Sequence, residues 1–173
     1  MTFTLSIPDA SDPMVALLAK SLWLNPEIRQ AREVPAAEYS DTPPIFVPVQ
    51  PMAGARPLKC WFNVRDAIAD RGGRAVFGWS LWARPDGHYQ AIHHGVWEQP
   101  SGSLVDITPM QIGGDSILFM ADARVPFDYG RLRAPASYVM FNDSTPEVAY
   151  HMWVAPDNTK FQTYVLLRME EDN

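Results

Sequence analysis

The sequence is poor in cysteine and in basic residues, and it has no long hydrophobic run. One cysteine, Cys60, excludes an internal disulfide and any zinc or iron–sulfur site built from several cysteines. Lys and Arg number 14 against 20 Asp and Glu, a formal net charge of −6, so the basic surface that nucleic-acid binding requires is not expected. No apolar stretch is long enough to predict a membrane-spanning helix. Nucleic-acid and membrane partners are therefore not expected.

The first residues also lack the features of an export signal. The segment MTFTLSIPDASD has neither a basic beginning nor a long apolar core. A lone thiol without an export signal favours a reducing compartment, so we expect a cytoplasmic protein. Hydrophobic residues make up 47% of the chain and charged residues 20%, which predicts a packed core. Because 173 residues is the length of one ordinary domain, residues 1–173 are expected to form a single domain.

The N-terminal segment, residues 1–34, is expected to be helical. Asp12 is a good N-cap and Pro13 suits the first helical position, and apolar residues follow at helical spacing. Asn25-Pro26 ends this pattern, and a second short helix is expected to run from there through Arg32.

Residues 35–58 are rich in proline and form a different kind of segment. Proline is excluded from helix interiors and from central strands, so we expect an extended arm on the surface, with Ile45-Phe46-Val47 as a short edge strand. A linker between two domains is the alternative. The preceding 34 residues are too few for a stable domain, which favours the arm.

Residues 59–173 are expected to form an α+β core. Cys60 to Arg71 has apolar residues on one helical face, and Gly72-Gly73 is a stop signal. After it the hydrophobic period changes to two, and tight turns separate the first segments, which predicts an antiparallel meander. Strands are expected at 75–83, 88–98, 103–108, 116–120, 137–141, 148–153 and 161–168. Helices followed by an antiparallel sheet give the α+β class.

Cys60 lies at the start of the predicted helix in this core. The unpaired backbone N–H groups and the positive dipole end at that position favour the thiolate form of the side chain. The same N–H groups are suited to hold the oxyanion of an attacked carbonyl. The alternative is that Cys60 is simply a small buried hydrophobic residue.

A histidine and a carboxylate are predicted to meet near this thiol. Pro100-Ser101-Gly102 fits a three-residue hairpin loop, which places Gln99 opposite Ser103. In that register His94 and Asp106 are diagonal neighbours on one face, about 7 Å apart at the backbone and within reach of a side-chain hydrogen bond.

The same register predicts what each face of the sheet contacts. The face of His94 is expected to point to the core, and we expect the helix that begins at Cys60 to pack on it. A loop of two or four residues would instead place His93 on the face of Asp106. With the three-residue loop, His93 lies on the opposite face beside Trp97, and a surface or rim position is expected for it.

Four short motifs follow one another between Cys60 and Pro109: CWFNV, RGGRA, HHGVW and LVDITP. The order of these motifs resembles that in the transglutaminase-like branch of the papain-fold cysteine enzymes. The resemblance implies the fold and the chemistry of that branch. The resemblance implies that Cys60 is the nucleophile, His94 the general base and Asp106 the residue that orients the base. The family usually has His-Ala-Trp and Asp-Pro-Thr, whereas Trp97 here comes one residue later and Asp106 is followed by Ile-Thr-Pro. These departures bear on substrate contacts more than on the triad.

Further candidate site residues are Gln50, Trp61 and Asn63. Papain-like enzymes use an upstream glutamine as an oxyanion donor, which makes Gln50 a candidate, and an exposed loop amide is the alternative. Asn63 would either line the cleft or cap the first turn of its helix. Trp61, Trp79 and Trp82 would either line a substrate groove or pack within the fold.

The favoured hypothesis is therefore a cysteine-dependent acyl-transfer enzyme that needs no cofactor. It would act on an amide, ester or thioester of a peptide, protein or small acyl substrate, and hydrolysis and transfer both stay open. A non-catalytic interaction protein that keeps the fold is the first alternative. The second is a metal site formed by Cys60, His94 and Asp106, with or without His93.

Overall fold

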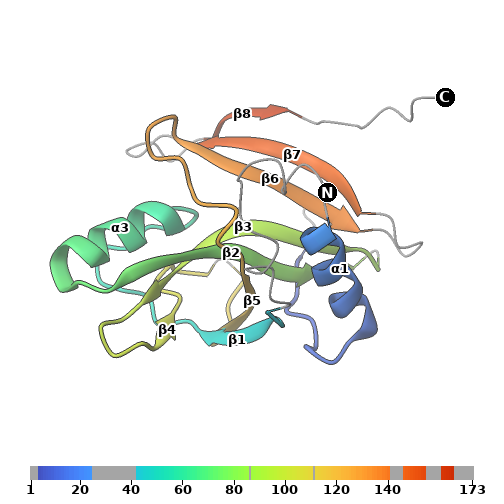
Figure 1. Cartoon of the computed structure of the whole chain (residues 1–173), viewed down its shortest axis with the longest axis horizontal. Coiled ribbons are helices and arrows are strands. Elements are labelled where there is room, and N and C mark those ends of the chain that lie inside the picture. The colour runs from blue at the N-terminus through green and yellow to red at the C-terminus, as the bar shows by residue number, and fades with distance from the viewer. Residues whose placement is uncertain are drawn as a thin grey trace.

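The computed structural model describes residues 4–24, 42–85, 87–110, 112–140, 146–154 and 161–165. These residues form a mixed α+β fold in which the sheet predominates (Figure 1). Its helices are α1 (Pro13–Leu24) and α3 (Cys60–Arg71). Its strands are β1 (Ile45–Pro48), β2 (Arg74–Ala83), β3 (Tyr89–Glu98), β4 (Leu104–Val105), β5 (Ser116–Ala121), β6 (Arg133–Met140), β7 (Pro146–Val154) and β8 (Phe161–Val165). Neither of the helices described is long and apolar enough to cross a membrane.

The strands form one antiparallel sheet around β2 and β3. The order is β1-β5-β2-β3-β6-β7-β8, and β4 also pairs with β3 (Figure 1). β6 pairs with the beginning of β3, Tyr89–Ala91, and β4 pairs with its end, Trp97–Glu98. The first turn of α3 lies against the stretch between them. A Cβ atom added at Gly95 would be in ordinary van der Waals contact with Trp61 Cδ1, at 3.6 Å, which places the Trp61 ring directly over this stretch of β3.

The proline-rich arm closes part of this sheet into a ring. Val49, just after β1, bridges Asp106, just after β4. The Asp106 N–H donates to the Pro48 carbonyl at 2.9 Å, and the Gln50 N–H donates to the Asp106 carbonyl at 2.8 Å. The strands β1, β5, β2, β3 and β4 therefore enclose a core of their own, which contains Val47, Val96, Ile117 and Phe119.

Ring closure also corrects the predicted length of β4. The strand was expected to cover 103–108, but its pairing with β3 ends at Val105. From Asp106 onward the backbone groups bond instead to the arm, and Met52 N–H donates to the Ile107 carbonyl at 3.1 Å. The short strand predicted for the arm is confirmed. The extended course predicted for the arm holds only for 42–52, because the chain then turns at Ala53-Gly54 and again at Pro57-Leu58.

The predicted boundaries of both helices agree with the structure. Asp12 Oδ1 accepts the Met14 N–H at 2.9 Å and so acts as the N-cap of α1. α3 ends at Gly72, whose N–H donates to the Ile68 carbonyl at 2.9 Å. Gly73 has φ +83° and passes the Glu98 carbonyl so closely that no side chain fits there. The second helix expected through Arg32 lies outside the described residues.

The later strands also occur where the period-two pattern predicted them, with shifted ends. β6 begins at Arg133 instead of 137, and β7 spans Pro146–Val154 around the predicted 148–153. β8 is described for Phe161–Val165, and the rest of its predicted length lies outside the described residues. Existence and type of these elements were thus predictable, whereas their ends depend on partners elsewhere in the chain.

The packing of α3 differs from the prediction. Val64 and Ala67 of α3 pack against Trp97 and Val105, on the face of β3 that carries His93. The expectation that α3 covers the His94 face was wrong. That face is covered by β1 and β5, because the ring curls around it.

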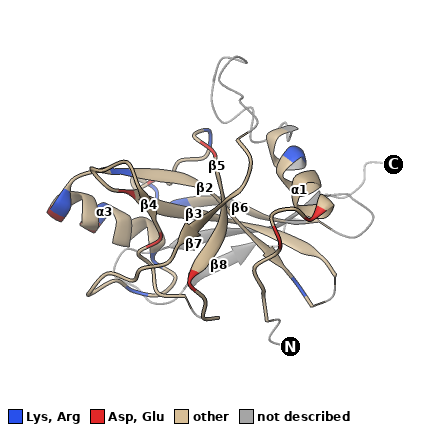
Figure 2. Cartoon of the chain, turned by 90° about the horizontal axis from the view of Figure 1, so that it is seen from below, with Lys and Arg blue, Asp and Glu red and all other residues tan. Residues whose placement is uncertain are grey.

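Charged side chains on the outer part of α3 are paired with their neighbours. Arg65 Nε donates to Asp66 at 2.8 Å, and Arg71 donates to Asp70 at 3.2 Å. Figure 2 shows basic and acidic residues side by side at this end of the molecule. The two signs of charge are therefore interspersed along this helix.

Candidate active site

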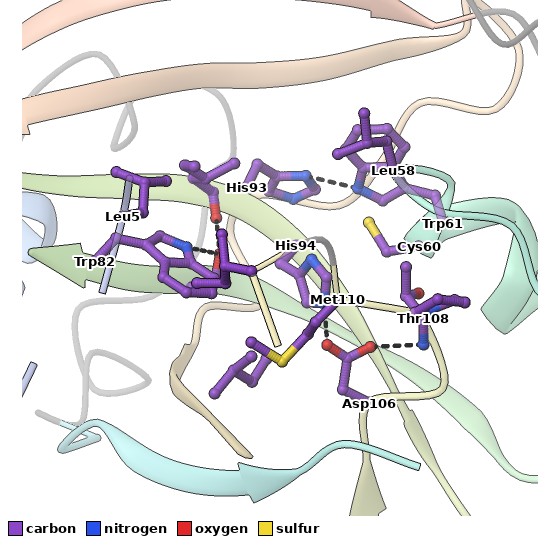
Figure 3. A pocket seen from close by; sticks show the side chains of 15 residues that line it. Leu5, Leu58, Cys60, Trp61, Trp82, His93, His94, Asp106, Thr108 and Met110 are labelled. Carbon is purple, nitrogen blue, oxygen red and sulfur yellow. Dashed lines mark hydrogen bonds and ion pairs between the residues drawn. The ribbon is translucent and has the colours of Figure 1, made fainter. Parts of the chain in front are cut away.

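A cavity of about 180 Å³ lies between the start of α3 and the strands of the ring (Figure 3). Cys60, His94 and Asp106 line one part of it. Most of the remaining wall is apolar: Leu5, Leu58, Trp61, Trp82, Ile92, Pro109, Met110, Ile112 and Ile117. The sulfur of the chain's single cysteine is thus beside a hydrophobic pocket.

The three residues of the predicted triad come together at this cavity. His94 Nε2 and Asp106 Oδ2 are 2.9 Å apart, which confirms the predicted meeting of these two side chains. The imidazole lies between the Asp106 carboxylate on one side and the Cys60 sulfur on the other (Figure 3). Because Asp106 engages Nε2, Nδ1 is the ring nitrogen left for the thiol.

Electrostatics favour the protonated form of this imidazole. Burial alone would lower the pKa of His94. The negative charges of Asp106 and of the Cys60 thiolate, together with hydrogen bonds to both, outweigh burial and raise that pKa well above its ordinary value. The arrangement therefore favours a charged imidazolium between the Asp106 carboxylate and the Cys60 sulfur.

The Asp106 carboxylate is held from two sides. Oδ1 accepts the backbone N–H of Thr108 at 2.9 Å, while Oδ2 faces His94. The backbone of Asp106 is bonded to the arm at Pro48 and Gln50. The carboxylate is buried and has little freedom to turn away from the imidazole.

Asn63 supports this arrangement from one turn into α3. Its amide nitrogen donates to Thr108 Oγ1 at 3.1 Å and to the Arg56 carbonyl at 2.8 Å. Its amide oxygen accepts the Arg56 N–H at 3.0 Å. Asn63 therefore ties α3 to the segment after Asp106 and is not part of the cavity wall.

Some of the other candidate site residues line the cavity, and the rest do not. The Gln50 side chain is exposed and does not line the cavity, although its backbone N–H helps to hold Asp106. Trp61 and Trp82 line the cavity. Trp79 does not line it; it is buried and donates its Nε1–H to Asp122 Oδ2 at 3.1 Å.

The first turn of α3 offers backbone donors beside the thiol. Lys59 is the N-cap residue, and the first helical bond runs from the Asn63 N–H to the Lys59 carbonyl at 2.9 Å. The N–H groups of Cys60 and Trp61 thus belong to the turn in which a helix leaves its donors unpaired. Leu58 has φ +59°, a left-handed conformation that costs a leucine about 1–2 kcal/mol. This strained residue directs the chain into α3 at the mouth of the cavity.

His93 is buried, and its predicted surface position was wrong. Only 2% of the residue is exposed. Its Nδ1 accepts the Trp61 Nε1–H at 3.0 Å, so Nε2 carries the proton and donates to the Val125 carbonyl. The Trp61 and Phe77 rings lie nearly parallel to the imidazole, each with its ring centre 6.0 Å from that of His93. Alternation along β3 identified the face of His93, but it contained no sign that α3 would cover that face.

The surroundings of His93 favour its neutral form. Burial lowers its pKa to about 3, although the hydrogen bond to Val125 opposes this shift. Protonation would also put a second donor opposite the Trp61 N–H. We infer that neutral His93 fixes the ring of Trp61, the residue that follows the thiol in α3.

We expect His93 to make the fold sensitive to acid. The unfolded chain binds a proton at His93 near pH 6.5, whereas the folded chain does not until about pH 3. The contribution of neutral His93 to the free energy of unfolding is therefore fully present above pH 6.5 and is lost as the pH falls. Between pH 6.5 and 5 the loss should be about 2 kcal/mol. Urea unfolding at both pH values, in the wild type and in His93→Gln, measures it. An equal loss in the variant, which cannot titrate there, would contradict the assignment.

Within the described part of the chain, no group of three or more His, Cys, Asp or Glu side chains is arranged to hold a metal ion. Both ring nitrogens of His93 are also engaged by Trp61 and Val125, so His93 is not available as the additional ligand considered above.

No family model, curated protein or solved structure matches this chain.

Proposed function

We propose that this protein is a cysteine-dependent acyl-transfer enzyme in which Cys60, His94 and Asp106 act as a catalytic triad. The observation that carries the proposal is the position of the His94 imidazole, between a carboxylate at 2.9 Å and the sulfur of Cys60, at the wall of a cavity. A nucleophile beside a base, and a base held by a third group, is the arrangement that activates a thiol.

The reaction follows from these positions. His94 holds the proton of the Cys60 thiol, and the thiolate attacks the carbonyl carbon of an amide, ester or thioester. The oxygen of the tetrahedral intermediate lies near the N–H groups of Cys60 and Trp61, at the positive end of α3. As the intermediate collapses, the bond to the leaving group breaks, and the imidazolium gives its proton to that group. An acyl group remains on Cys60 as a thioester.

The second half of the reaction releases the acyl group. His94, now neutral, takes a proton from water or from an amine, which attacks the thioester carbonyl. The sulfur leaves as thiolate, and the product is an acid or an amide. Asp106 keeps the imidazole in one orientation through both halves and stabilises its charged form. Both hydrolysis and transfer to an amine are compatible with this site, with a peptide, a protein or a small acyl compound as substrate.

We also propose that the core is of the transglutaminase-like, papain-like kind. Three features support this: the thiol begins a helix, the histidine lies on a strand after that helix, and the aspartate follows the next hairpin. The packing of α3 beside a curled antiparallel sheet agrees with it.

Acylation of the purified protein by p-nitrophenyl acetate tests the function. We expect a burst of nitrophenolate and one acetyl group per chain by intact-mass spectrometry, with neither in Cys60→Ser. Urea-unfolded wild-type protein is the matched control, because it offers the same single thiol without the site. Base catalysis by His94 should make folded protein react at least about a hundredfold faster. Equal rates would instead support a non-catalytic interaction protein.

A further inference from the structure

The wall of the cavity indicates which acyl group the site accepts. Beyond the thiol it includes Trp82 and Met110 (Figure 3). Ile92 and Ile117 line it as well. These side chains come from β3, β5, β2 and the segment after β4. The pocket therefore lies within the framework of the ring and does not depend on one loop.

The described wall offers nothing for a charged substrate. Its ionisable side chains are Cys60, His93, His94 and Asp106. His94 is engaged with Asp106 and Cys60, and His93 with Trp61 and Val125. A charged group brought into this pocket would lose its water without gaining a partner. Cys60, His94, Asp106 and Thr108 lie at the thiol end, where a carbonyl would react. Ser80, at the Trp82 end, already donates to the Ile92 carbonyl and accepts the Trp82 N–H.

The size of the cavity sets an approximate length. Its volume is about 180 Å³. An apolar protein cavity of about 150 Å³ holds one benzene molecule. The pocket thus has room for about six carbon atoms in compact form.

We infer that the substrate of this site carries an uncharged, apolar acyl group of about six carbon atoms. This rests on the proposed function. The acyl carbonyl lies at Cys60 and the chain extends toward Trp82 and Met110. The leaving group extends to the other side, past Leu58, whose side chain is exposed at the mouth.

Chain-length dependence of Cys60 acylation tests this inference. Rates are measured with p-nitrophenyl acetate, butyrate, hexanoate and decanoate, each divided by the rate of the urea-unfolded protein. We expect about a fourfold rise per added methylene up to hexanoate and no further rise to decanoate. The matching thioesters form a second arm, in which the same rise is expected because the acyl pocket is the same. A flat profile in both arms would overturn the inference while leaving the proposed function intact.

A pair of variants tests where the acyl chain lies in the pocket. Met110→Trp should occupy part of the pocket and reduce the hexanoate-to-acetate rate ratio at least about tenfold. Phe46→Trp places the same side chain on an exposed position of β1 outside the cavity, and its ratio should equal that of the wild type. Equal ratios in both variants would contradict the assigned position of the chain.

Reversible binding tests the pocket even if no ester acylates Cys60. Hexanamide has the expected chain and lacks a good leaving group. We expect hexanamide to shift the NMR signals of the Trp82 and Ile92 side chains. We expect 6-aminohexanamide, which adds one charge, to leave these signals unchanged. Binding of hexanamide without acylation would contradict the proposed function alone. Equal binding of both amides, or of neither, would overturn the inference about the pocket.

Discussion

Replacing His94 by alanine should slow the acylation of Cys60 by a p-nitrophenyl ester by about 10²–10⁴-fold at neutral pH. This is the usual contribution of a positioned general base. In the proposed mechanism the imidazole holds the thiol proton, and its pKa is raised by Asp106 and by Cys60. Without it, the thiol has to ionise unaided and the leaving group loses its proton donor. The measurement is the burst rate of nitrophenolate release over a range of pH.

The pH profile separates loss of the base from general damage. In His94→Ala the rate should keep rising with pH, as for a free thiol, so the difference from the wild type narrows in alkaline solution. Fast thiol-specific alkylation of the unfolded variant confirms that Cys60 is intact. His88→Ala, which removes an imidazole outside the cavity, is the matched control and should react like the wild type. A His94→Ala rate within a factor of three of the wild type would mean that the imidazole does not act on the thiol.

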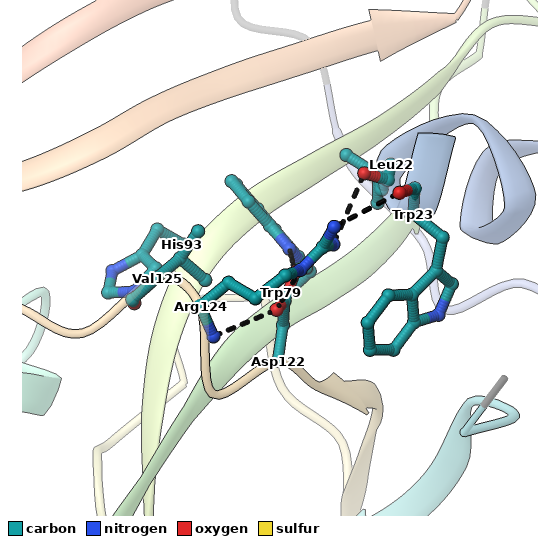
Figure 4. Close-up of polar contacts among 7 residues, drawn as sticks. All are labelled: Leu22, Trp23, Trp79, His93, Asp122, Arg124 and Val125. Carbon is teal, nitrogen blue, oxygen red and sulfur yellow. Dashed lines mark hydrogen bonds and ion pairs between the residues drawn. The ribbon is translucent and has the colours of Figure 1, made fainter. Parts of the chain in front are cut away.

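Replacing Asp122 by alanine should lower the free energy of unfolding by about 3–5 kcal/mol, because it removes the carboxylate that pairs with a buried guanidinium. Arg124 Nη2 and Asp122 Oδ2 are 2.7 Å apart, and their side chains are 3% and 0% exposed. Arg124 Nε donates to Asp122 Oδ1 at 2.7 Å as well (Figure 4). Trp79 donates to the same carboxylate and would also lose its partner. Urea unfolding followed by fluorescence measures the loss.

This ion pair also connects α1 to the sheet. The guanidinium donates to the carbonyls of Leu22 and Trp23, at 3.3 and 3.0 Å, in the last turn of α1. It lies 4.2 Å from the ring centre of Trp23 (Figure 4). Loss of Asp122 should therefore loosen α1 as well as the centre of the sheet.

An exposed ion pair in the same sheet is the matched control for this prediction. Arg74 and Glu98 are also 2.7 Å apart, but their side chains are 71% and 24% exposed. Arg74→Ala should therefore cost no more than about 1 kcal/mol. If Asp122→Ala costs as little as Arg74→Ala, the buried pair is not a main support of the fold.

The contact between the His94 and Asp106 side chains was predictable because the turn at Pro100-Ser101-Gly102 sets the register of the hairpin. Gly102 has φ +87°, the Gln99 N–H donates to the Ser103 carbonyl at 2.9 Å, and Trp97 stands opposite Val105. These observations confirm the predicted register of the hairpin. A hairpin is specified by residues next to one another in the chain, so its register can be derived from sequence.

The contacts of α3 were not predictable in the same way. Both faces of β3 are buried, one by α3 and the other by β1 and β5. Alternation along a strand indicates which residues share a face, but when neither face is exposed it cannot tell which neighbour covers it. That is why His93 was expected at the surface and α3 was expected on the wrong side.

By itself, the sequence determined the class of the fold, the limits of α1 and α3, the register between β3 and β4, and the shared face of His94 and Asp106. Each of these depends on periodicity, caps or turns within a few residues. Only the tertiary structure decided that the arm closes a ring at Asp106, that Asn63 ties α3 to Thr108, and that an apolar cavity opens beside Cys60. These features join residues far apart in the chain, and such contacts leave no periodic pattern in the sequence.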